Sequence, residues 1–557
     1  MIKGIDYPDW MTSESLAVLN GGYLLPDETP KEMYLRVAYS IAKHLNKPEL
    51  TEKFYNLMWD NKLCPASPIL SNSGTNRGLP ISCNSIHVGD MTVDIFDKNT
   101  ELAMLSKYGA GVGIYMGEIR PRGTPITGGG TSDGPIPWCS LYDKTSSVVS
   151  QGATRRGAAA VYLPIDHPDI KEFLNIRRPV GDVNTRCLNL HHGVCITDSF
   201  MNRVWNGDKE AQELLLEVYK TRFETGEPYI FFTDNINKNN PQCYKDLNLN
   251  VLTSNICSEI TLFTDIDHSF VCCLSSLNLV NWDKITDDDI YYSIWFLDGV
   301  LNEYINKARN RPMMENAIRS AVKGRAIGLG VLGWHTLLQS EGTPFHSFRA
   351  TVLNKAIFER IRRESERATK DLAIEYGEPE WCVGHNRRNT HLLAVAPTAS
   401  NSIISGNVSA GIEPIAANAF AKKTAKGTFI QQNKYLAKEL QAINKDTPEV
   451  WTSIATNDGS VQHLDFLTPE QKEVYLTAYE INQMALIYQA ADRQKFIDQS
   501  QSLNLFFPAN ADPQYFHDVH WKAWELGVKT LYYCRTGTII KGDIASRHQE
   551  DCIACEA

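Results

Sequence analysis

Long helical patterns alternate with short apolar segments along most of this chain. Apolar residues recur at helical spacing in residues 196–224, 285–310 and 350–376, where Leu353 and Ile357 stand four apart. Between these stretches lie short apolar segments of the kind that form strands: LNLHHGVCI, LTSNICSEI, FVCCLSSLNLV, HLLAVAP and KTLYYCR. This alternation predicts an α/β fold, either a strand-and-helix barrel or a doubly wound sheet.

The character of the sequence changes twice along the chain. Residues 1–60 are predicted to form a helical N-terminal region, because apolar residues such as Met33 and Val37 recur four apart. Residues 61–536 carry the alternating pattern, with Gly-, Pro-, Ser- and Asn-rich loops between the first apolar runs. Large apolar residues are scarce in residues 537–557, which are therefore predicted to form a mobile tail.

The composition is that of an ordinary globular protein. The chain has 557 residues, of which 43% are hydrophobic and 22% charged, so it can bury a core without disulfides. Its net charge of −10 gives no general attraction to nucleic acid or to anionic membranes, and no apolar run reaches the ~18 residues of a membrane span. The start, MIKGIDYPDW, has no basic segment followed by an apolar stretch, so we expect a reducing, cytoplasmic compartment.

Two short motifs carry only weak signals. GAGVGI at 109–114 is similar to a dinucleotide fingerprint, but Ile114 stands where the third glycine would fall, and no GxxxxGK[ST] loop occurs. We expect these glycines to let the backbone approach another group closely. His191 and His192 could ligate a metal, yet the sequence has neither HExxH nor paired CxxC motifs, so a solvent-facing or core pair is the favoured interpretation.

The 13 cysteines offer stronger signals, and Cys257 is the first of them. It lies in TSNICSEI between Asn255 and Glu259, and side chains at this two-residue spacing converge in an extended segment or tight loop. A nearby carboxylate raises a thiol pKa, which disfavours a thiolate nucleophile. The pattern favours a thiol used in its protonated or radical form beside a general base, with a buried structural cysteine as the alternative.

Two further cysteine contexts are of interest. Cys83 lies in LPISCNSI and the adjacent Cys272 and Cys273 lie in FVCCLSSLNL, where each could also be a buried strand residue. Cys552 and Cys555 form a CxxC near the end of the polar tail. A single CxxC cannot complete a tetrahedral zinc site in one chain, whereas a dithiol on a flexible tether suits thiol–disulfide exchange, which is the interpretation we favour.

Six motifs together resemble the large, catalytic subunit of class I ribonucleotide reductase. They are SC at 82–83, NICSEI, CCLSSLNL, PTASNSIISGNVSAGIEP at 397–414, TLYYCRT at 530–536 and the C-terminal CxxC. They occur in the family's order from about residue 15 to the end of the chain. The resemblance implies a ribonucleoside-diphosphate reductase that makes deoxyribonucleotides for DNA synthesis. It also implies a ten-stranded α/β barrel of two antiparallel five-stranded halves, spanning residues 61–536 and enclosing a finger loop.

The resemblance assigns the radical chemistry to the NICSEI motif. Cys257 is implied to become a thiyl radical that removes the 3′ hydrogen of the ribose. Glu259 is implied to be the base for the 3′ hydroxyl, and Asn255 to hold the ribose by a hydrogen bond. This assignment agrees with the preference for a radical thiol derived from the neighbouring carboxylate.

Four other cysteines are implied to supply and renew reducing equivalents. Cys83 and Cys272 would reduce the ribose and end as a disulfide, and Cys272 is preferred over Cys273 on the position of the family's cysteine before LSxxNL. Cys552 and Cys555 would then reduce that disulfide by exchange and be reduced by thioredoxin or glutaredoxin. Tethering raises the effective concentration of such a tail dithiol at an enclosed site.

Tyr532 and Tyr533 match the family's stacked tyrosines, which carry the radical to the cysteine. The implied radical source is a separate small subunit that contains a metal, with no metal or other cofactor bound by this chain. A homodimer is also expected. The rival enzyme, an adenosylcobalamin-dependent reductase, shares the cysteines but needs no tyrosine pair. A glycyl-radical reductase lacks its motif here, and a non-catalytic thiol- or zinc-binding protein would not explain NICSEI.

The resemblance also implies where nucleotides bind. Backbone N–H groups and hydroxyls of the PTASN turn would surround the substrate diphosphate. Two serines would make further substrate contacts and one glycine would allow close approach to the base and ribose. The residues concerned are Pro397, Thr398, Ala399, Ser400, Asn401, Ser67, Ser82 and Gly111.

Control by a nucleotide effector, dNTP or ATP, is implied at a second site. Asp90 and Arg120 match effector-contacting positions, and Gln151 and Arg155 lie in SQGATRRGAAA, which resembles the loop that reports the effector to the active site. Met91 stands where the family commonly has serine. The N-terminal ATP-cone domain of larger members has no counterpart in this sequence, so we expect no on/off response through such a site.

Overall fold

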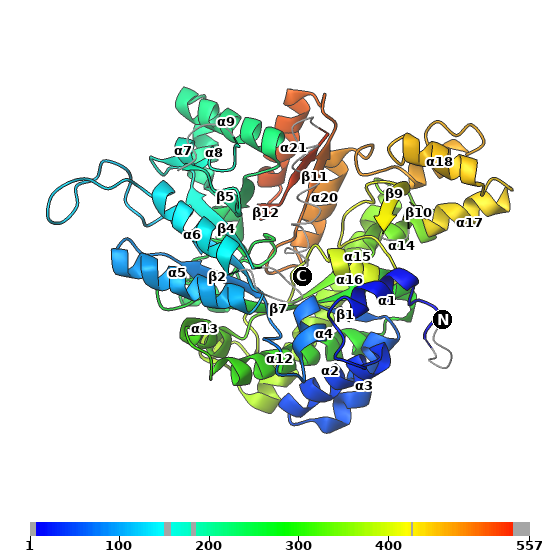
Figure 1. Ribbon diagram of the computed structural model, residues 1–557, viewed down its shortest axis with the longest axis horizontal. Helices are drawn as coiled ribbons and strands as arrows, with labels where there is room; N and C mark the ends of the chain where they lie inside the picture. The colour runs from blue at the N-terminus through cyan, green and yellow to red at the C-terminus, as the bar shows by residue number, and fades with distance from the viewer. Residues whose placement is uncertain (1–6, 150–156, 180–184, 425–426, 538–557) are drawn as a thin grey trace.

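The computed structural model describes residues 7–149, 157–179, 185–424 and 427–537 (Figure 1). Helices occupy the N-terminal region, as predicted. The longest of them begins with a capping box, in which the side chains of Thr29 and Glu32 each accept a hydrogen bond from the other residue's backbone, and its apolar face is buried. These helices are α1 (Ser13–Asn20), α2 (Pro30–His44) and α3 (Thr51–Trp59), with the 3-10 turn η1 (Pro48–Leu50) before α3.

Five parallel strands form the first half of the central sheet. Each pairs with the next along the chain, and nearly all their residues are buried, as expected of a parallel sheet covered on both faces. The strands are β2 (Cys83–His87), β3 (Gly111–Tyr115), β4 (Ala158–Pro164), β5 (Leu190–Ile196) and β6 (Tyr229–Phe232). Their connections carry α5 (Thr92–Lys107), α6 (Ile136–Val148), α7 (Ile170–Phe173), α8 (Asp198–Trp205) and α9 (Lys209–Thr225).

A second set of five parallel segments follows. It begins with β7 (Phe270–Asn278) and β8 (Ile327–Leu332), continues through parallel bridges at residues 392–395 and 499–502, and ends at residues 530–536. The last two segments include β11 (Leu505–Phe507), β12 (Thr530–Leu531) and β13 (Cys534–Thr536), and β11 and β13 are parallel. The helices between them are α12 (Asp287–Ala308), α13 (Glu315–Gly324), α14 (Trp334–Ser340), α15 (Phe348–Tyr376), α20 (Gln483–Gln494) and α21 (Pro513–Glu525).

Two antiparallel contacts join the halves into a closed barrel. Strand β2 pairs with β7 at one seam, and β6 pairs with β12 at the other. In addition, β1 (Leu63–Pro65) pairs antiparallel with residues 275–277 of β7. The predicted barrel of two antiparallel five-stranded halves is therefore confirmed, and Figure 1 shows its helices arranged around the strands.

The remaining elements lie around this barrel. A small second core, which includes Leu436, Leu440, Trp451 and Ile454, lies in the region of residues 419–475. The elements of that region are β9 (Ala419–Thr424), β10 (Gly427–Gln432), α17 (Lys434–Ala442), α18 (Pro448–Thr456) and α19 (Pro469–Val474). The others are α4 (Ser67–Asn72), α10 (Thr233–Lys238), α11 (Gln242–Asp246), α16 (Ala399–Ile404), η3 (Leu279–Lys284) and η4 (Glu380–Cys382).

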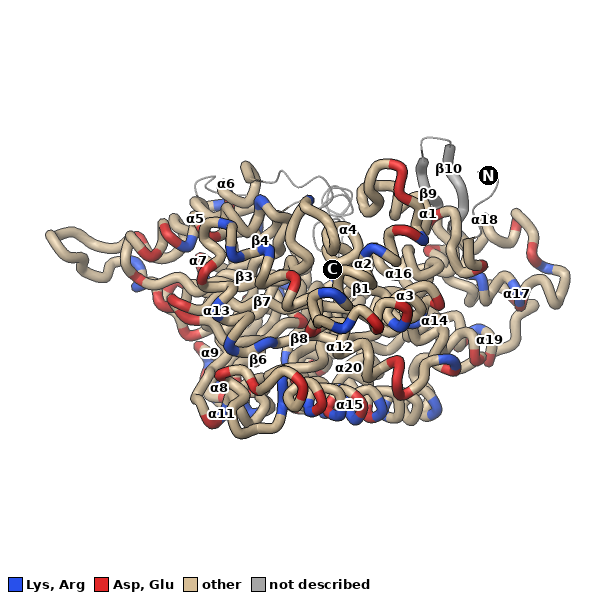
Figure 2. Tube along the Cα trace, turned by 90° about the horizontal axis from the view of Figure 1, so that it is seen from below, with Lys and Arg blue, Asp and Glu red and all other residues tan. Residues whose placement is uncertain are grey.

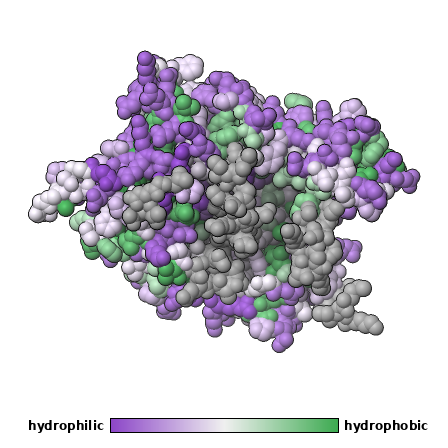
Figure 3. Space-filling view, turned by 45° about the horizontal axis from the view of Figure 1, so that its top comes forward, coloured by the Kyte–Doolittle hydropathy of each residue, from purple (hydrophilic) through white to green (hydrophobic). Residues whose placement is uncertain are grey.

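Charged side chains of both signs are interspersed along the chain. Figure 2 shows them close together on α15, where Arg360 pairs with Asp287 at 2.6 Å and Arg367 pairs with Glu364 at 2.8 Å. Figure 3 shows a largely hydrophilic face with small hydrophobic groups. Among the described residues, none of the helices combines the length and apolar character needed to cross a membrane.

Candidate active site

The segment LTSNICSEI is a loop inside the barrel, as the finger loop of the family resemblance implies, whereas its apolar character alone had suggested a strand. Its Ser254 carbonyl passes so close to β3 that a Cβ on Gly113 would lie 1.8 Å from the carbonyl oxygen. The Tyr162 hydroxyl of β4 is 2.6 Å from Ser254 Oγ and donates to the Asn255 carbonyl at 3.1 Å. The glycine motif therefore does permit a close backbone approach, and its partner is this loop.

The second half of the barrel holds the other side of the loop. Thr530 Oγ1 donates to the Ser258 carbonyl at 2.9 Å, and the Ser500 N–H donates to the Glu259 carbonyl at 2.9 Å. Because the loop is bonded to strands of both halves, its position is fixed from two sides.

A tight turn brings the NICSEI side chains into one buried region. The Ser258 N–H donates to the Asn255 carbonyl at 3.2 Å, and Ser258 adopts the left-handed conformation with φ 69°. Asn255, Cys257 and Glu259 are all fully buried. The Asn255 Oδ1 accepts from the Ile260 N–H at 3.1 Å, while its Nδ2 has no partner among the described residues. That amide can therefore donate to a bound molecule.

Cys83 and Cys272 face each other across the seam between β2 and β7. They are directly paired in antiparallel register, and both side chains are buried. Directly paired residues have Cα atoms about 4.5–5.5 Å apart with side chains on one face, within the range of about 4.4–6.8 Å that a disulfide requires. The two thiols are therefore placed to form one.

Electrostatics at Cys272 favour the protonated thiol. Burial raises the pKa of Cys272 well above its usual value, and the nearby Cys273, Cys83 and Glu259 raise it further. Cys273 points the other way, because its Sγ donates to the Leu297 carbonyl of α12 at 3.3 Å. The two neighbouring cysteines therefore occupy different faces of β7, and only Cys272 shares a face with Cys83.

Residues 499–502 connect the loop to this cysteine pair, although the sequence interpretation did not include them. Gln499 Nε2 lies 3.5 Å from Cys272 Sγ and donates to the Ile327 carbonyl at 2.8 Å. Ser502 Oγ donates to the Cys257 carbonyl at 2.6 Å and lies 3.2 Å from Glu259 Oε2. The only signal for this role was a polar run, QSQS, just before an apolar segment.

Tyr532 and Tyr533 form an aromatic cluster at the second seam of the barrel. Their ring centroids are 4.3 Å apart, and Tyr229 of β6 lies 4.9 Å and 5.1 Å from them. Tyr532 is buried, whereas Tyr533 is partly exposed. The cluster thus extends from the partly exposed Tyr533 toward Thr530, which is bonded to Ser258 beside Cys257. Tyr229 was not identified from the sequence.

The PTASN turn leads into α16. Thr398 has a left-handed φ of 52°, and its hydroxyl oxygen accepts a hydrogen bond from the Gly411 N–H at 2.7 Å. Asn401 accepts from Ser67 Oγ at 3.2 Å and donates to the Pro65 carbonyl at 2.9 Å. Ser67 and the turn are therefore brought together, with Pro397 and Ala399 on either side of Thr398 and Ser400 buried.

The two remaining predicted substrate contacts lie beside Cys83. The Ser82 carbonyl accepts from the Gly111 N–H at 2.8 Å, and Gly111 is the parallel partner of Cys83 on β3. These positions border the cysteine pair, but the glycine whose missing side chain admits the loop is Gly113.

Two of the predicted effector residues are bonded to each other. Asp90 accepts from the Arg120 N–H at 2.8 Å and from its Nε at 2.6 Å. Burial raises the pKa of Asp90, but the bonds from Arg120 outweigh that effect and hold the pKa below its usual value. Met91 is the N-cap of α5, is 60% exposed and makes no side-chain cap bond. The other predicted residues Gln151, Arg155, Cys552 and Cys555 lie outside the described residues.

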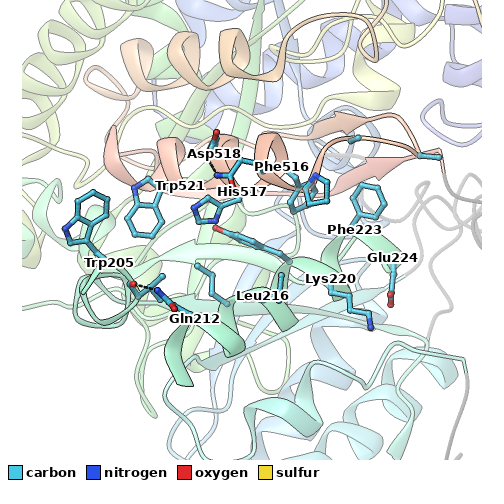
Figure 4. A pocket seen from close by; sticks show the side chains of 17 residues that line it. Trp205, Gln212, Leu216, Lys220, Phe223, Glu224, Phe516, His517, Asp518 and Trp521 are labelled. Atoms are coloured by element: carbon cyan, nitrogen blue, oxygen red, sulfur yellow. Dashed lines mark hydrogen bonds between the residues drawn. The ribbon is translucent and has the colours of Figure 1, made fainter. Parts of the chain in front are cut away.

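A groove of about 960 Å³ lies between α9 and α21, away from the cysteines. Figure 4 shows Phe516 and Trp521 of α21 opposite Leu216 and Phe223 of α9. It contains none of the predicted site residues, but Arg222 of α9 donates to the Tyr532 carbonyl at 2.7 Å.

Comparisons with known proteins match most of the chain to two family domains. A model described as "Ribonucleotide reductase, barrel domain" matches residues 81–211, 206–383 and 380–534, and one described as "Ribonucleotide reductase, all-alpha domain" matches residues 10–78. The ribonucleoside-diphosphate reductase large subunit of Invertebrate iridescent virus 3 is 36% identical, covering 97% of each chain. That of Caenorhabditis elegans is 32% identical, covering 91% of this chain and 73% of the worm protein.

A solved structure shares the whole architecture. The alpha subunit of the Actinobacillus ureae class Id ribonucleotide reductase superposes with a TM-score of 0.89 at 39% identity, covering 96% of this chain and 99% of that one. The two proteins are therefore similar in both fold and sequence along nearly the entire chain.

Proposed function

The chain belongs to the ribonucleotide reductase large-subunit family and is a catalytic subunit of ribonucleoside-diphosphate reductase. We propose that a thiyl radical on Cys257 begins its reaction. The closed barrel supports this proposal because it buries Cys257 completely. A buried thiyl radical is separated from water and from stray reductants.

The proposed reaction removes the ribose 2′ hydroxyl at the expense of two thiols. The Cys257 radical takes the 3′ hydrogen, and Glu259 accepts the proton of the 3′ hydroxyl. The 2′ hydroxyl leaves as water after it gains a proton. Cys83 and Cys272 together supply two electrons and two protons and are joined as a disulfide. Glu259 then returns its proton to the 3′ oxygen, and the 3′ hydrogen returns from Cys257, which regenerates the Cys257 radical.

The geometry of NICSEI supports these roles. Glu259 lies two residues from Cys257 in a turn, and Ser502 bonds both the Cys257 carbonyl and the Glu259 carboxylate. The Asn255 Nδ2 has a hydrogen to donate and no partner among the described residues. We assign it the ribose contact.

Renewal of the thiols is proposed to use the tail, residues 537–557. A thiolate of Cys552 or Cys555 attacks the Cys83–Cys272 disulfide, and the exchange leaves the tail oxidised and the barrel pair reduced. Thioredoxin or glutaredoxin then reduces the tail. The enclosed position of the barrel pair supports a tethered reductant, because both thiols are buried.

The radical is proposed to come from a separate, metal-containing small subunit through Tyr533 and then Tyr532. The ring contacts of 4.3–5.1 Å among Tyr229, Tyr532 and Tyr533 support such a path. We further propose a homodimer with an effector site at Asp90 and Arg120, extended by Gln151 and Arg155.

The substrate diphosphate is proposed to bind at the PTASN turn. Pro397 to Asn401, with Ser67, would hold the phosphates, while Ser82 and Gly111 would border the ribose and base. The bonds from Thr398 to Gly411 and from Asn401 to Ser67 support this, because they fix the turn before any ligand arrives.

The observation that carries the proposal is the pairing of Cys83 with Cys272, close enough to Glu259 of the NICSEI loop for that carboxylate to raise the pKa of Cys272. It is tested by assaying CDP reduction with purified small subunit or with adenosylcobalamin as the radical source. We expect activity only with the small subunit, and none from Cys257→Ser. Activity with adenosylcobalamin alone would overturn the assigned radical source, and an active Cys257→Ser variant would overturn the mechanism.

A further inference from the structure

A buried carboxylate gathers both histidines of the HH motif at the edge of the tyrosine cluster. Glu227 Oε1 lies 2.6 Å from His191 Nδ1, and Glu227 Oε2 lies 3.2 Å from His192 Nδ1. Arg177 Nε lies 3.6 Å from the same carboxylate. All four residues are buried or nearly so, and neither the proposed reaction nor the proposed radical path uses them.

The charge of Glu227 determines which histidine atom carries hydrogen. Burial raises the pKa of Glu227, but Arg177 and His191 outweigh that effect, so the pKa lies well below its usual value. Glu227 is therefore ionised and can only accept hydrogen bonds. A ring nitrogen 2.6 Å from an ionised carboxylate must carry its hydrogen, which fixes the Nδ1–H form of His191.

The same nitrogen also reaches Tyr533. His191 Nδ1 is 3.3 Å from the Tyr533 hydroxyl oxygen, and the two rings meet edge to face with centroids 5.8 Å apart. The hydrogen on Nδ1 is therefore shared between a short bond to Glu227 and a longer one to Tyr533. His192 offers a matched comparison, because it contacts Glu227 and packs its ring against Phe173 instead.

We propose that His191 is a positioning residue for Tyr533, donating a hydrogen bond from Nδ1 to its phenolic oxygen in an orientation set by Glu227. This inference rests on the proposed radical path, because it gives Tyr533 a fixed hydrogen-bond donor at the oxygen where a tyrosyl radical would reside. The donor is held by a buried ion pair and not by solvent. It thereby keeps the Tyr533 ring against Tyr229 and Tyr532.

Two other charged groups near Tyr533 are the same in every His191 variant. Arg535 lies over the Tyr533 ring at 4.9 Å, and Arg177 pairs with Glu227. Substitutions at His191 alone leave these charges in place. Asn is the informative replacement, because its side-chain amide can occupy the position of Nδ1 and donate a hydrogen bond, whereas Phe cannot donate one.

The experiment places 3-nitrotyrosine at position 533 of the full-length chain and titrates its phenol by visible absorbance. Removing one donor with His191→Phe should raise the phenol pKa by about half a unit to one unit. His191→Asn should restore most of that change, and the matched His192→Asn should leave the pKa unaltered. In the chain with Tyr533 intact, CDP turnover should fall about threefold to tenfold in His191→Phe with unchanged CDP binding, and recover in His191→Asn.

Two outcomes distinguish a failure of the His191 proposal from a failure of the proposed radical path. If Tyr533→Phe leaves turnover unaffected, the radical path is wrong, yet the nitrotyrosine titration still reports whether His191 donates to position 533. If Tyr533→Phe is inactive while His191→Phe changes neither the titration nor the turnover, the radical path stands and the role of His191 is refuted. A shift of the phenol pKa in His192→Asn as large as that in His191→Phe would also refute it.

Discussion

Cys83 on β2 and Cys272 on β7 are directly opposite each other at the seam where the two antiparallel halves of the barrel meet. The seam has a chemical consequence as well as a structural one. Strands from the two halves bring together thiols that are far apart in the sequence, at the separation that a disulfide needs. The adjacent Cys273 is on the opposite face, bonded to Leu297 of α12.

The first prediction separates Cys272 from its neighbour. Cys272→Ser should abolish dCDP formation with thioredoxin as reductant, because the barrel disulfide cannot form without it. The matched variant Cys273→Ser should retain turnover within about threefold, since it alters only a weak bond to Leu297 and costs about 1 kcal/mol of stability. Steady-state assays of both proteins decide the matter, and the reverse order of sensitivity would contradict the assignment.

The second prediction concerns the Ser502 hydroxyl, which contacts both the Cys257 carbonyl and the Glu259 carboxylate. Ser502→Ala removes bonds to the Cys257 carbonyl and the Glu259 carboxylate, so kcat for CDP reduction should fall about tenfold, the equivalent of about 1.4 kcal/mol. Ser500→Ala is the control, because that hydroxyl bonds Thr530 instead. Equal losses of kcat in the two variants would show that Ser502 has no specific role in the site.

The third prediction is a pH dependence of stability at Asp498. Its carboxylate accepts bonds from the Leu392 and Leu393 N–H groups and pairs with Arg362 at 2.7 Å. Burial raises the pKa of Asp498, but Arg362 and His391 outweigh it and lower the pKa to about 2. Since the folded pKa is below the ordinary value of about 3.9, the stabilisation is present above pH 4 and is lost as the pH falls toward 2.

Asp498→Asn should therefore lower the free energy of unfolding by about 2–3 kcal/mol at pH 7, with a difference from the wild type that shrinks as the pH falls from 5 to 2. Urea unfolding at a series of pH values measures it. A difference that stays constant over this range would mean that the Asp498 charge contributes nothing.

The fourth prediction uses the uncapped start of α5. Met91 is an exposed N-cap residue without a cap bond, so Met91→Ser should stabilise the protein by about 1 kcal/mol by accepting a hydrogen bond from the first turn. Met91→Ala is the control and should give no such gain. Thermal unfolding of the three proteins compares them, and a melting temperature for Met91→Ser no higher than that of Met91→Ala would contradict the capping argument.

The sequence allowed much of the fold to be predicted. Helical spacing indicated α9, α12 and α15, because their apolar residues must face the barrel. The apolar character of residues 252–260 suggests a strand, and only the family resemblance implies a loop there, since these residues are buried by the barrel around them and not by pairing in a sheet. Periodicity alone cannot distinguish these two kinds of burial.

The candidate site was predictable only where its residues form compact motifs. Asn255, Cys257 and Glu259 lie within five consecutive positions, so their convergence follows from local geometry. Ser502 and Glu227 act on residues distant in the sequence, and their contacts depend on strand pairing that no local pattern specifies. The family resemblance indicated Cys272 over Cys273, and the register of β7 supplies the physical reason.

The most direct test of the account is a single turnover without added reductant. Pre-reduced protein carrying Cys552→Ser and Cys555→Ser is mixed with small subunit and CDP, and dCDP is counted while disulfides are mapped by mass spectrometry. We predict about one dCDP per active site with a matching amount of Cys83–Cys272 disulfide, and neither product from a chain that also carries Cys257→Ser. Formation of dCDP without that disulfide, or from the chain lacking Cys257, would contradict the account.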